Sequence, residues 1–189
     1  MKRIAVFASG SGSNAENLAT YFANHSEITV ALVLSDRKNA FVLQRMAPLG
    51  VPTRFMPKED FENGTVLELL KRNKIDLIVL AGFLRLVSPS LLAAYPHRII
   101  NLHPALLPKF GGKGMFGMHV HEAVVEAGEP ETGITIHFID AKFDEGEIIA
   151  QYKTEIFQGE TAESIAAKIH LLEMKWYPNV VEKVCNELA

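Results

Sequence analysis

The stretch IINLHPALLP, residues 99–108, joins an apolar run to an amide, an imidazole and two prolines. The run at 98–102 predicts a short buried strand, which must end near His103 because proline cannot donate to a sheet ladder. Asn101 and His103 are two residues apart, so their side chains project from the same side of the strand. Open α/β sheets bind ligands at the carboxyl ends of their strands, which makes this end a candidate site.

The chemistry of the pair indicates transfer at a carbonyl carbon. Asn101 offers an uncharged donor for a developing oxyanion, and His103 can move protons near neutral pH. An isolated Asn-x-His is more often a strand end whose side chains only bond backbone groups. Two further stretches favour the catalytic interpretation, residues 8–14 at the first strand end and residues 143–146 downstream.

Strand-like apolar runs alternate with helical patterns through the first hundred residues. The expected strands are 3–8, 28–34, 53–56, 76–80 and 98–102, and the expected helices are 14–24, 39–49, 59–73 and 89–94. This alternation predicts βαβ units, and therefore a mostly parallel sheet with helices on both faces.

The pattern changes after His103. A loop with four glycines, residues 109–117, leads to a helix at 120–127, and two strands at 133–139 and 148–157 follow without a helix between them. Two such strands predict an antiparallel ribbon at the sheet edge. A last helix starts after the cap Thr161, is expected to break at Pro178 and then resumes. We expect one Rossmann-like α/β domain over residues 1–189.

Composition excludes several classes of protein. The chain of 189 residues is 48% hydrophobic and carries a net charge of −3 without a Lys/Arg cluster, so a nucleic-acid groove is not expected. No apolar run approaches the roughly 20 residues of a membrane span. Cys185 is the single cysteine, which excludes an internal disulfide and a Cys-based zinc site and fits a reducing cytoplasm.

The first expected strand ends in the turn Ser9-Gly10-Ser11-Gly12-Ser13-Asn14. Glycines let the backbone approach an anion, and free N–H groups at the following helix start favour phosphate. No lysine follows as in a nucleotide P-loop, and Ala15 stands where a dinucleotide fingerprint has its third glycine. The turn indicates a phosphate monoester on a small substrate, with a plain tight turn as the alternative.

Taken together, five stretches resemble the phosphoribosylglycinamide formyltransferases of purine biosynthesis, nearly from end to end. They are the turn, AGFLR at 81–85, NLHPALLP at 101–108, GITIHF at 133–138 and DEG at 144–146. The resemblance implies transfer of a formyl group from 10-formyltetrahydrofolate, as co-substrate, to the amine of glycinamide ribonucleotide in de novo purine biosynthesis. The wider folate-dependent formyltransferase fold shares Asn-x-His-Pro and Asp-x-Gly, and the turn indicates the glycinamide ribonucleotide branch.

The resemblance also implies roles for individual residues. The catalytic trio is Asn101, His103 and Asp144. Substrate binding falls to the turn residues Gly10, Ser11, Gly12, Ser13 and Asn14, to His170 at the phosphate and to Glu173 at the ribose. The folate pocket is walled by Phe83, Leu84, Arg85, Leu86, Val87, Asp140, Ala141, Lys142 and Phe143. A carboxylate at Asp144 is expected to raise the pKa of His103 and to orient its ring.

The other histidines raise two questions, whether the chain binds a metal and what role His137 has. No metal is expected, because Asn, one His and one Asp are poor zinc ligands as a set. His119 and His121 have a spacing that suits a strand, but they lie at a loop-to-helix junction. His137, on an alternating strand, is either a satisfied core histidine or a partner of the trio or of the substrate.

The sequence departs from the family pattern in three places. The loop at 109–117 is longer and richer in glycine, and the segment 61–64 lacks an arginine thought to face the folate glutamate tail. His170 stands where glutamine is frequent, and a protonated histidine there would make phosphate binding depend on pH.

Enzymes on the same fold are the nearest alternatives. Methionyl-tRNA formyltransferases add a further domain, formyltetrahydrofolate hydrolases usually carry an N-terminal regulatory domain, and sugar-nucleotide formyltransferases lack this turn. A non-catalytic folate- or phosphate-binding protein is the alternative from another class, and the complete trio argues against it. We expect a cytoplasmic monomer or homodimer whose partners are the two small substrates, without nucleic acid or membrane.

Overall fold

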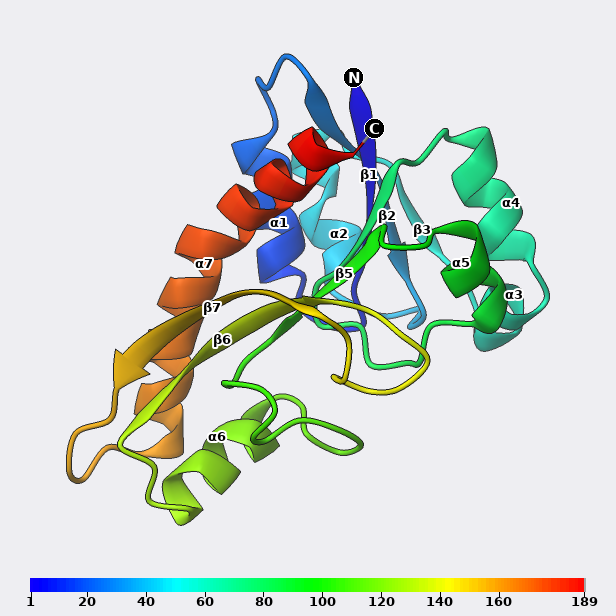
Figure 1. The fold of residues 1–189 in the computed structure, drawn as a ribbon. Coiled ribbons are helices and arrows are strands. Elements are labelled where there is room, and N and C mark those ends of the chain that lie inside the picture. Colours follow the sequence, from blue (N-terminus) through cyan, green and yellow to red (C-terminus); the bar gives the residue numbers. More distant parts are fainter. Residues whose placement is uncertain (189) are drawn as a thin grey trace.

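The computed structural model describes residues 1–188 of the chain. Within these residues seven strands form one sheet in the order β3-β2-β1-β4-β5-β6-β7 (Figure 1). Strands β1 to β5 pair in parallel, whereas β6 is antiparallel to both β5 and β7, so the predicted sheet with an antiparallel C-terminal edge is confirmed. The strands are β1 (Lys2–Phe7), β2 (Ile28–Ser35), β3 (Thr53–Phe55), β4 (Leu77–Leu80), β5 (Ile99–His103), β6 (Glu131–Phe138) and β7 (Ile148–Glu155).

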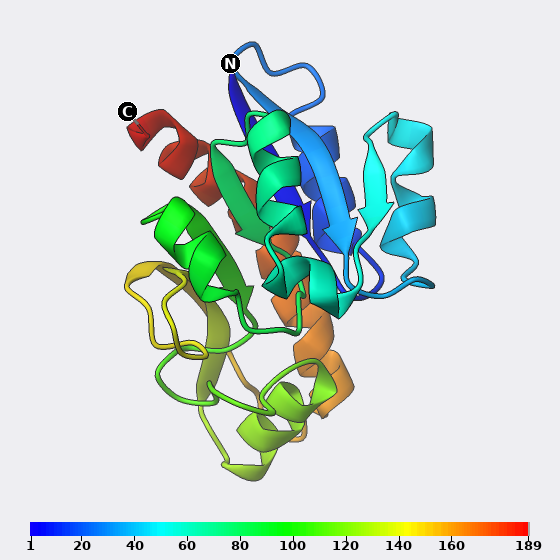
Figure 2. The same ribbon diagram turned by 90° about the vertical axis from the view of Figure 1, so that its right-hand side faces the viewer.

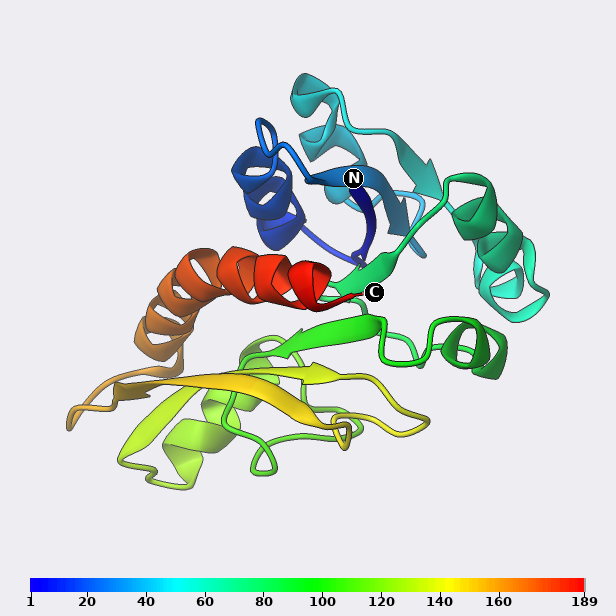
Figure 3. The same ribbon diagram turned by 45° about the horizontal axis from the view of Figure 1, so that its top comes forward.

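Helices cover both faces of the sheet, as predicted. Figure 2 shows α4 and α5 in front of the sheet and α7 behind it, and Figure 3 shows the same separation from above. The α7 side holds α1 (Ser13–Tyr21), α2 (Val42–Arg45), the 3-10 helix η1 (Ala47–Leu49), α6 (Met118–Glu126) and α7 (Ala162–Glu187). The other side holds α3 (Lys58–Glu62), α4 (Thr65–Arg72) and α5 (Pro89–Ala94).

Strand β1 shows how the sheet divides the core. Ile4 and Val6 pack into the cluster beneath α1 and α7, while Ala5 and Phe7 pack into the cluster beneath α4 and α5. All four side chains are fully buried. Successive side chains of a strand point to opposite faces, so a strand that is apolar throughout requires helices on both sides.

Two predicted helices are interrupted. The pattern at 59–73 is divided into α3 and α4, because Gly64 adopts a φ of 91° and the side-chain oxygen of Asn63 accepts the N–H of Thr65 at 2.9 Å. The pattern at 39–49 becomes the short α2 followed by η1. Pro48, which has no N–H to donate, lies in the first turn of η1.

The predicted break at Pro178 is wrong, because α7 runs through it as one helix of 26 residues. Proline has no N–H to bond to the carbonyl four residues earlier, which belongs to Met174. The side-chain amide of Asn17, on α1, donates to that carbonyl at 2.8 Å. A tertiary hydrogen bond therefore replaces the missing helical one, and the sequence of α7 alone could not reveal it.

None of the helices described here combines the length and apolar character that crossing a bilayer requires.

Candidate active site

A cavity of about 620 Å³ opens at the carboxyl ends of β1, β4 and β5, where the sequence predicted a site. Its volume is typical of a site for a small organic ligand. The lining includes most of the predicted site residues, namely Gly10, Ser11, Gly12, Ser13, Asn14, Phe83, Leu84, Arg85, Leu86, Val87, Asn101, His103, Lys142, Phe143, Asp144 and Glu173. Asp140, Ala141 and His170 lie outside the lining.

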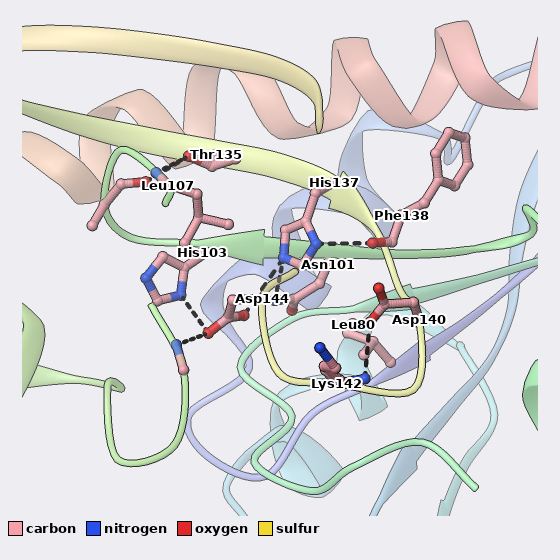
Figure 4. A network of polar contacts seen from close by, with 12 residues as sticks. Leu80, Asn101, His103, Leu107, Thr135, His137, Phe138, Asp140, Lys142 and Asp144 are labelled. Carbon is pink, nitrogen blue, oxygen red and sulfur yellow. Dashed lines mark hydrogen bonds and ion pairs between the residues drawn. The ribbon is translucent and has the colours of Figure 1, made fainter. Parts of the chain in front are cut away.

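Two paired strands position an amide and two imidazoles. Asn101 and His103 lie at the end of β5, and His137 of β6 stands opposite Asn101 in the antiparallel register. Nδ2 of Asn101 lies 3.2 Å from Nε2 of His137. Figure 4 shows these three side chains gathered around Asp144.

Asp144 lies in the loop between β6 and β7, with a φ of 56°. Its Oδ2 is 3.6 Å from Nδ1 of His103, and its Oδ1 is 3.6 Å from Nε2 of His137. The backbone N–H of Gly112 donates to Oδ2 at 2.9 Å. The structure therefore brings the predicted trio into one cleft, and the loop at 109–117 contributes to it directly.

The pKa of Asp144 is lowered from its ordinary value. Burial alone would raise the pKa of this carboxyl, but the neighbouring rings of His137 and His103 and the N–H of Gly112 together outweigh burial. The carboxylate form is therefore the resting state at neutral pH.

The pKa of His103 is lowered, whereas the sequence-based expectation was that Asp144 would raise it. Burial lowers the pKa of His103 and outweighs the raising effects of Asp144 and of the hydrogen bond to the Phe110 carbonyl. Nε2 lies 2.8 Å from that carbonyl oxygen, which can only accept, so Nε2 carries the proton of the neutral ring. The lone pair on Nδ1 then faces Asp144.

His137 is a partner of the trio, which was one of its two sequence-based interpretations. Its ring is fully buried, and Nδ1 lies 2.9 Å from the carbonyl oxygen of Phe138, so Nδ1 is the protonated nitrogen. Nε2 can then accept from Asn101. Because the amide nitrogen of Asn101 has two hydrogens, one stays available to a ligand.

The turn at 10–14 presents backbone amides to the cavity. Gly12 has a φ of 77°, and a Cβ there would lie 2.3 Å from Cγ2 of Val42, so a larger residue does not fit. Helix α1 starts at Ser13 without a side-chain cap, which leaves its first N–H groups without helical partners. These groups and the positive end of the helix favour an anion.

Glu173 of α7 lies beside this turn and provides acceptors. Nδ2 of Asn14 donates to Oε2 of Glu173 at 2.9 Å, while Oδ1 of Asn14 is buried without a partner among residues 1–188. Burial raises the pKa of Glu173, although Asn14 and His170 act in the lowering direction. His170, half-exposed, has its Nδ1 3.6 Å from Oε2 of Glu173. The free acceptors fit hydroxyl donors such as those of a ribose.

The wall at 83–87 is held in place by a network of hydrogen bonds that was not predicted from the sequence. Nε of Arg85 and Oγ of Ser9 both donate to the buried carboxylate of Asp36, each at 2.6 Å. Oγ of Ser9 in turn accepts the backbone N–H of Leu84 at 3.1 Å. The ends of β1 and β2 therefore hold the loop after β4 in place.

Two residues of the expected folate wall have structural roles that are visible here. The ring of Phe83 packs against Phe7 and Phe61, with centroid separations of 5.4 and 5.2 Å. Oδ1 of Asp140 accepts the N–H of Lys142 at 2.8 Å, so Asp140 shapes the turn before Asp144.

The two histidines of α6 differ in position. The His119 side chain is 68% exposed and pairs with Glu122, whereas His121 is 6% exposed and lines the cavity. His121 was not among the predicted site residues, although its spacing to the buried Val124, three residues on, indicates an inward face. Within the described residues, no group of three or more His, Cys, Asp or Glu side chains is arranged to hold a metal ion.

Comparison with known proteins agrees with this geometry. Residues 2–181 match the family model described as formyl transferase. The phosphoribosylglycinamide formyltransferase of Bacillus subtilis is 38% identical over 190 residues, covering 97% of this chain and 95% of the relative.

Solved structures of phosphoribosylglycinamide formyltransferases are similar to this chain over nearly its whole length. The phosphoribosylglycinamide formyltransferase of Streptococcus pneumoniae superposes with a TM-score of 0.85 at 39% identity, covering 97% of this chain and 99% of that one. Glycinamide ribonucleotide transformylase 1 of Geobacillus kaustophilus gives 0.89 at 38% identity, with 98% and 99% covered. On the match over residues 2–181 and on these near full-length similarities, the chain belongs to the formyl transferase family.

Proposed function

We propose that this protein is a phosphoribosylglycinamide formyltransferase, which transfers the formyl group of 10-formyltetrahydrofolate to the amine of glycinamide ribonucleotide in de novo purine biosynthesis. The observation that carries the proposal is the convergence of Asn101, His103 and Asp144 in one cavity. The phosphate-type turn and the 83–87 wall line the same cavity. The similarity to relatives with this activity supports the same assignment.

The acceptor nucleotide lies between the turn at 10–14 and the trio. Backbone N–H groups at the start of α1 hold its phosphate, since they have no helical partners. The carboxylate of Glu173, which lines the cavity beside the turn, accepts from its ribose hydroxyls. This placement directs the glycinamide amine toward Asn101 and His103.

The formyl folate lies against the wall at 83–87 and the segment at 142–143. Leu84 and Leu86 are exposed apolar side chains there, and Arg85 supplies a positive charge for the carboxylates of the donor. Apolar contacts with a few placed polar groups suit a flat heterocyclic ligand.

Chemistry starts with attack of the neutral amine on the formyl carbon, which moves the carbonyl π electrons onto oxygen. Nδ2 of Asn101 donates one hydrogen to His137 and its other hydrogen to this developing oxyanion. Burial keeps His103 neutral, so Nδ1 can take the proton that the amine loses, through a bridging water.

Collapse of the tetrahedral intermediate breaks the bond between the formyl carbon and the folate nitrogen. The imidazolium of His103, stabilised by the carboxylate of Asp144 at 3.6 Å, returns the proton to that leaving nitrogen. The proton balance therefore closes with tetrahydrofolate and the formylated nucleotide as products, and no step requires a metal.

The test is to mix the protein with both substrates and to follow deformylated folate by absorbance and the nucleotide by mass spectrometry. We expect one formylated nucleotide for each tetrahydrofolate. Formate release without acceptor would instead indicate a hydrolase, and binding without turnover would indicate a non-catalytic protein. We further propose that residues 1–189 act as a single domain, as a monomer or homodimer in the cytoplasm.

A further inference from the structure

His121 is buried in the wall of the cavity without a hydrogen bond. It lies in the first turns of α6, and its side chain is 6% exposed. Nδ1 is enclosed and has no partner among the described residues. The exposed part of the ring borders the cavity that it lines.

A buried imidazole without any hydrogen bond calls for an explanation, because the great majority of buried polar side-chain atoms in proteins are paired. An unpaired ring nitrogen keeps its desolvation cost, which an apolar side chain at the same place would not have. His119, two residues earlier on the same helix, is exposed and paired with Glu122. The lack of a partner is therefore specific to the histidine that faces the cavity.

The position of His121 assigns it to the acceptor end of the cavity. Helix α6 packs against α7, which carries Glu173, through a shared apolar cluster that contains Val124 and Ile169. His121 and His103 both line the cavity. The donor wall at 83–87 follows β4, on the other side of β5 from β6.

We propose that His121 binds the glycinamide arm of the acceptor nucleotide through a hydrogen bond between the edge of its imidazole that borders the cavity and the amide of that arm. The inference rests on the proposed function. Burial and then His103 lower the pKa of His121, so the ring is neutral at pH 7. A neutral imidazole has one donor and one acceptor, and an amide offers the complementary N–H and C=O. An uncharged ring selects this arm without attracting the phosphate that belongs at the turn.

The experiment compares the parent protein with His121→Phe, His121→Asn and the matched control His119→Phe. Equilibrium binding of glycinamide ribonucleotide is measured without the formyl donor, so that no turnover occurs, and ribose 5-phosphate is the reference ligand that lacks the arm. We expect His121→Phe to weaken the nucleotide about tenfold, the loss of one neutral hydrogen bond, and to leave ribose 5-phosphate unchanged. His121→Asn, which keeps a polar group on this side chain, should recover most of the loss, and His119→Phe should lose nothing.

The unfolding temperature distinguishes a binding role of His121 from a structural role. His121→Phe removes an unpaired polar group, so its unfolding temperature without ligand should not fall below that of the parent. Equal affinity of the parent and both His121 variants for the nucleotide would overturn the inference alone. Equal weakening of nucleotide and ribose 5-phosphate would overturn it too, since the arm would not be the contact. A parent protein that does not bind the nucleotide would instead overturn the proposed function and the inference with it.

Discussion

The guanidinium of Arg85 donates to the carboxylate of Asp36 at 2.6 Å, and this pair ties the donor wall of the cavity to the end of β2. The Asp36 side chain is 3% exposed, while that of Arg85 is 37% exposed. The buried partner therefore fixes the direction in which the accessible one points.

Asp36→Asn keeps the shape of the side chain and removes its charge, so Arg85 should lose its fixed direction. We expect KM for the formyl donor to rise about tenfold, while KM for the nucleotide and kcat change less than about twofold. Steady-state kinetics with each substrate varied in turn measures this. Glu68→Gln, in an exposed pair with Lys71, is the control and should change neither constant. An equal rise in both KM values would mean that Asp36 supports the whole cavity rather than its donor wall.

Asp144→Asn preserves shape and removes the charge that stabilises the imidazolium of His103. Turnover should fall by about 10²–10⁴, with equilibrium binding of both substrates little changed. Single-turnover rates and separate binding measurements test this. Near-normal turnover would remove Asp144 from the chemistry.

The loop at 109–117 holds two resting contacts of the site, from the carbonyl of Phe110 to His103 and from the N–H of Gly112 to Asp144. Substrates compete with these contacts, and four glycines leave the loop few side-chain anchors. We expect amide hydrogen exchange in the loop to slow at least severalfold when both substrates are bound. Exchange that is equally slow with and without them would show that the substrates do not order this loop. The exposed turn at 158–160 serves as the internal reference.

Acid should destabilise the protein through its buried neutral histidines. Burial lowers the pKa of both His103 and His121 below the ordinary value of 6.5. Below that pH the unfolded chain binds more protons than the folded one, so the free energy of unfolding decreases as the pH falls. Denaturant titrations from pH 7.5 to 5.0 measure this slope. His121→Phe should make the slope shallower, and an unchanged slope would show that His121 does not contribute.

His170 lies next to Glu173 but outside the cavity lining, so its role depends on reaching the phosphate. If its ring contributes to phosphate binding, His170→Ala should weaken equilibrium binding of the nucleotide severalfold while formyl donor binding stays unaffected. Equal nucleotide affinity of parent and variant would make His170 a bystander.

The stretch at 99–108 was sufficient to predict the end of β5 and its two polar side chains, because proline and strand periodicity act locally. The alternation of strands and helices was also predictable, because strands that are apolar throughout have to be covered by helices on both faces. The divided α3 and α4 also followed a local signal, Asn63-Gly64, which the helical pattern around it obscured.

What the sequence did not reveal depends on contacts between distant residues. Asp36 meets Arg85 across 49 positions of the chain. His103 has a lowered pKa because of how deeply the fold buries it, and the nearby carboxylate alone led to the opposite expectation. The contact between Asp36 and Arg85 and the lowered pKa of His103 both arise from packing, so the spacing of residues in the sequence does not reveal them.

Pro178 has a consequence for which acceptors the protein can accommodate. The helical hydrogen bond that it omits is replaced by Asn17, and Asn14 of the same helix α1 bonds Glu173, so α1 and α7 are joined at two points one turn apart. In the proposed function the phosphate binds at α1 and the ribose at α7, so these two contacts keep the distance between the two proposed subsites fixed. A nucleotide analogue with one extra methylene between phosphate and ribose would then place its amine short of or beyond the formyl carbon. Discrimination by length would come from a proline whose sequence position suggested only a break in the last helix.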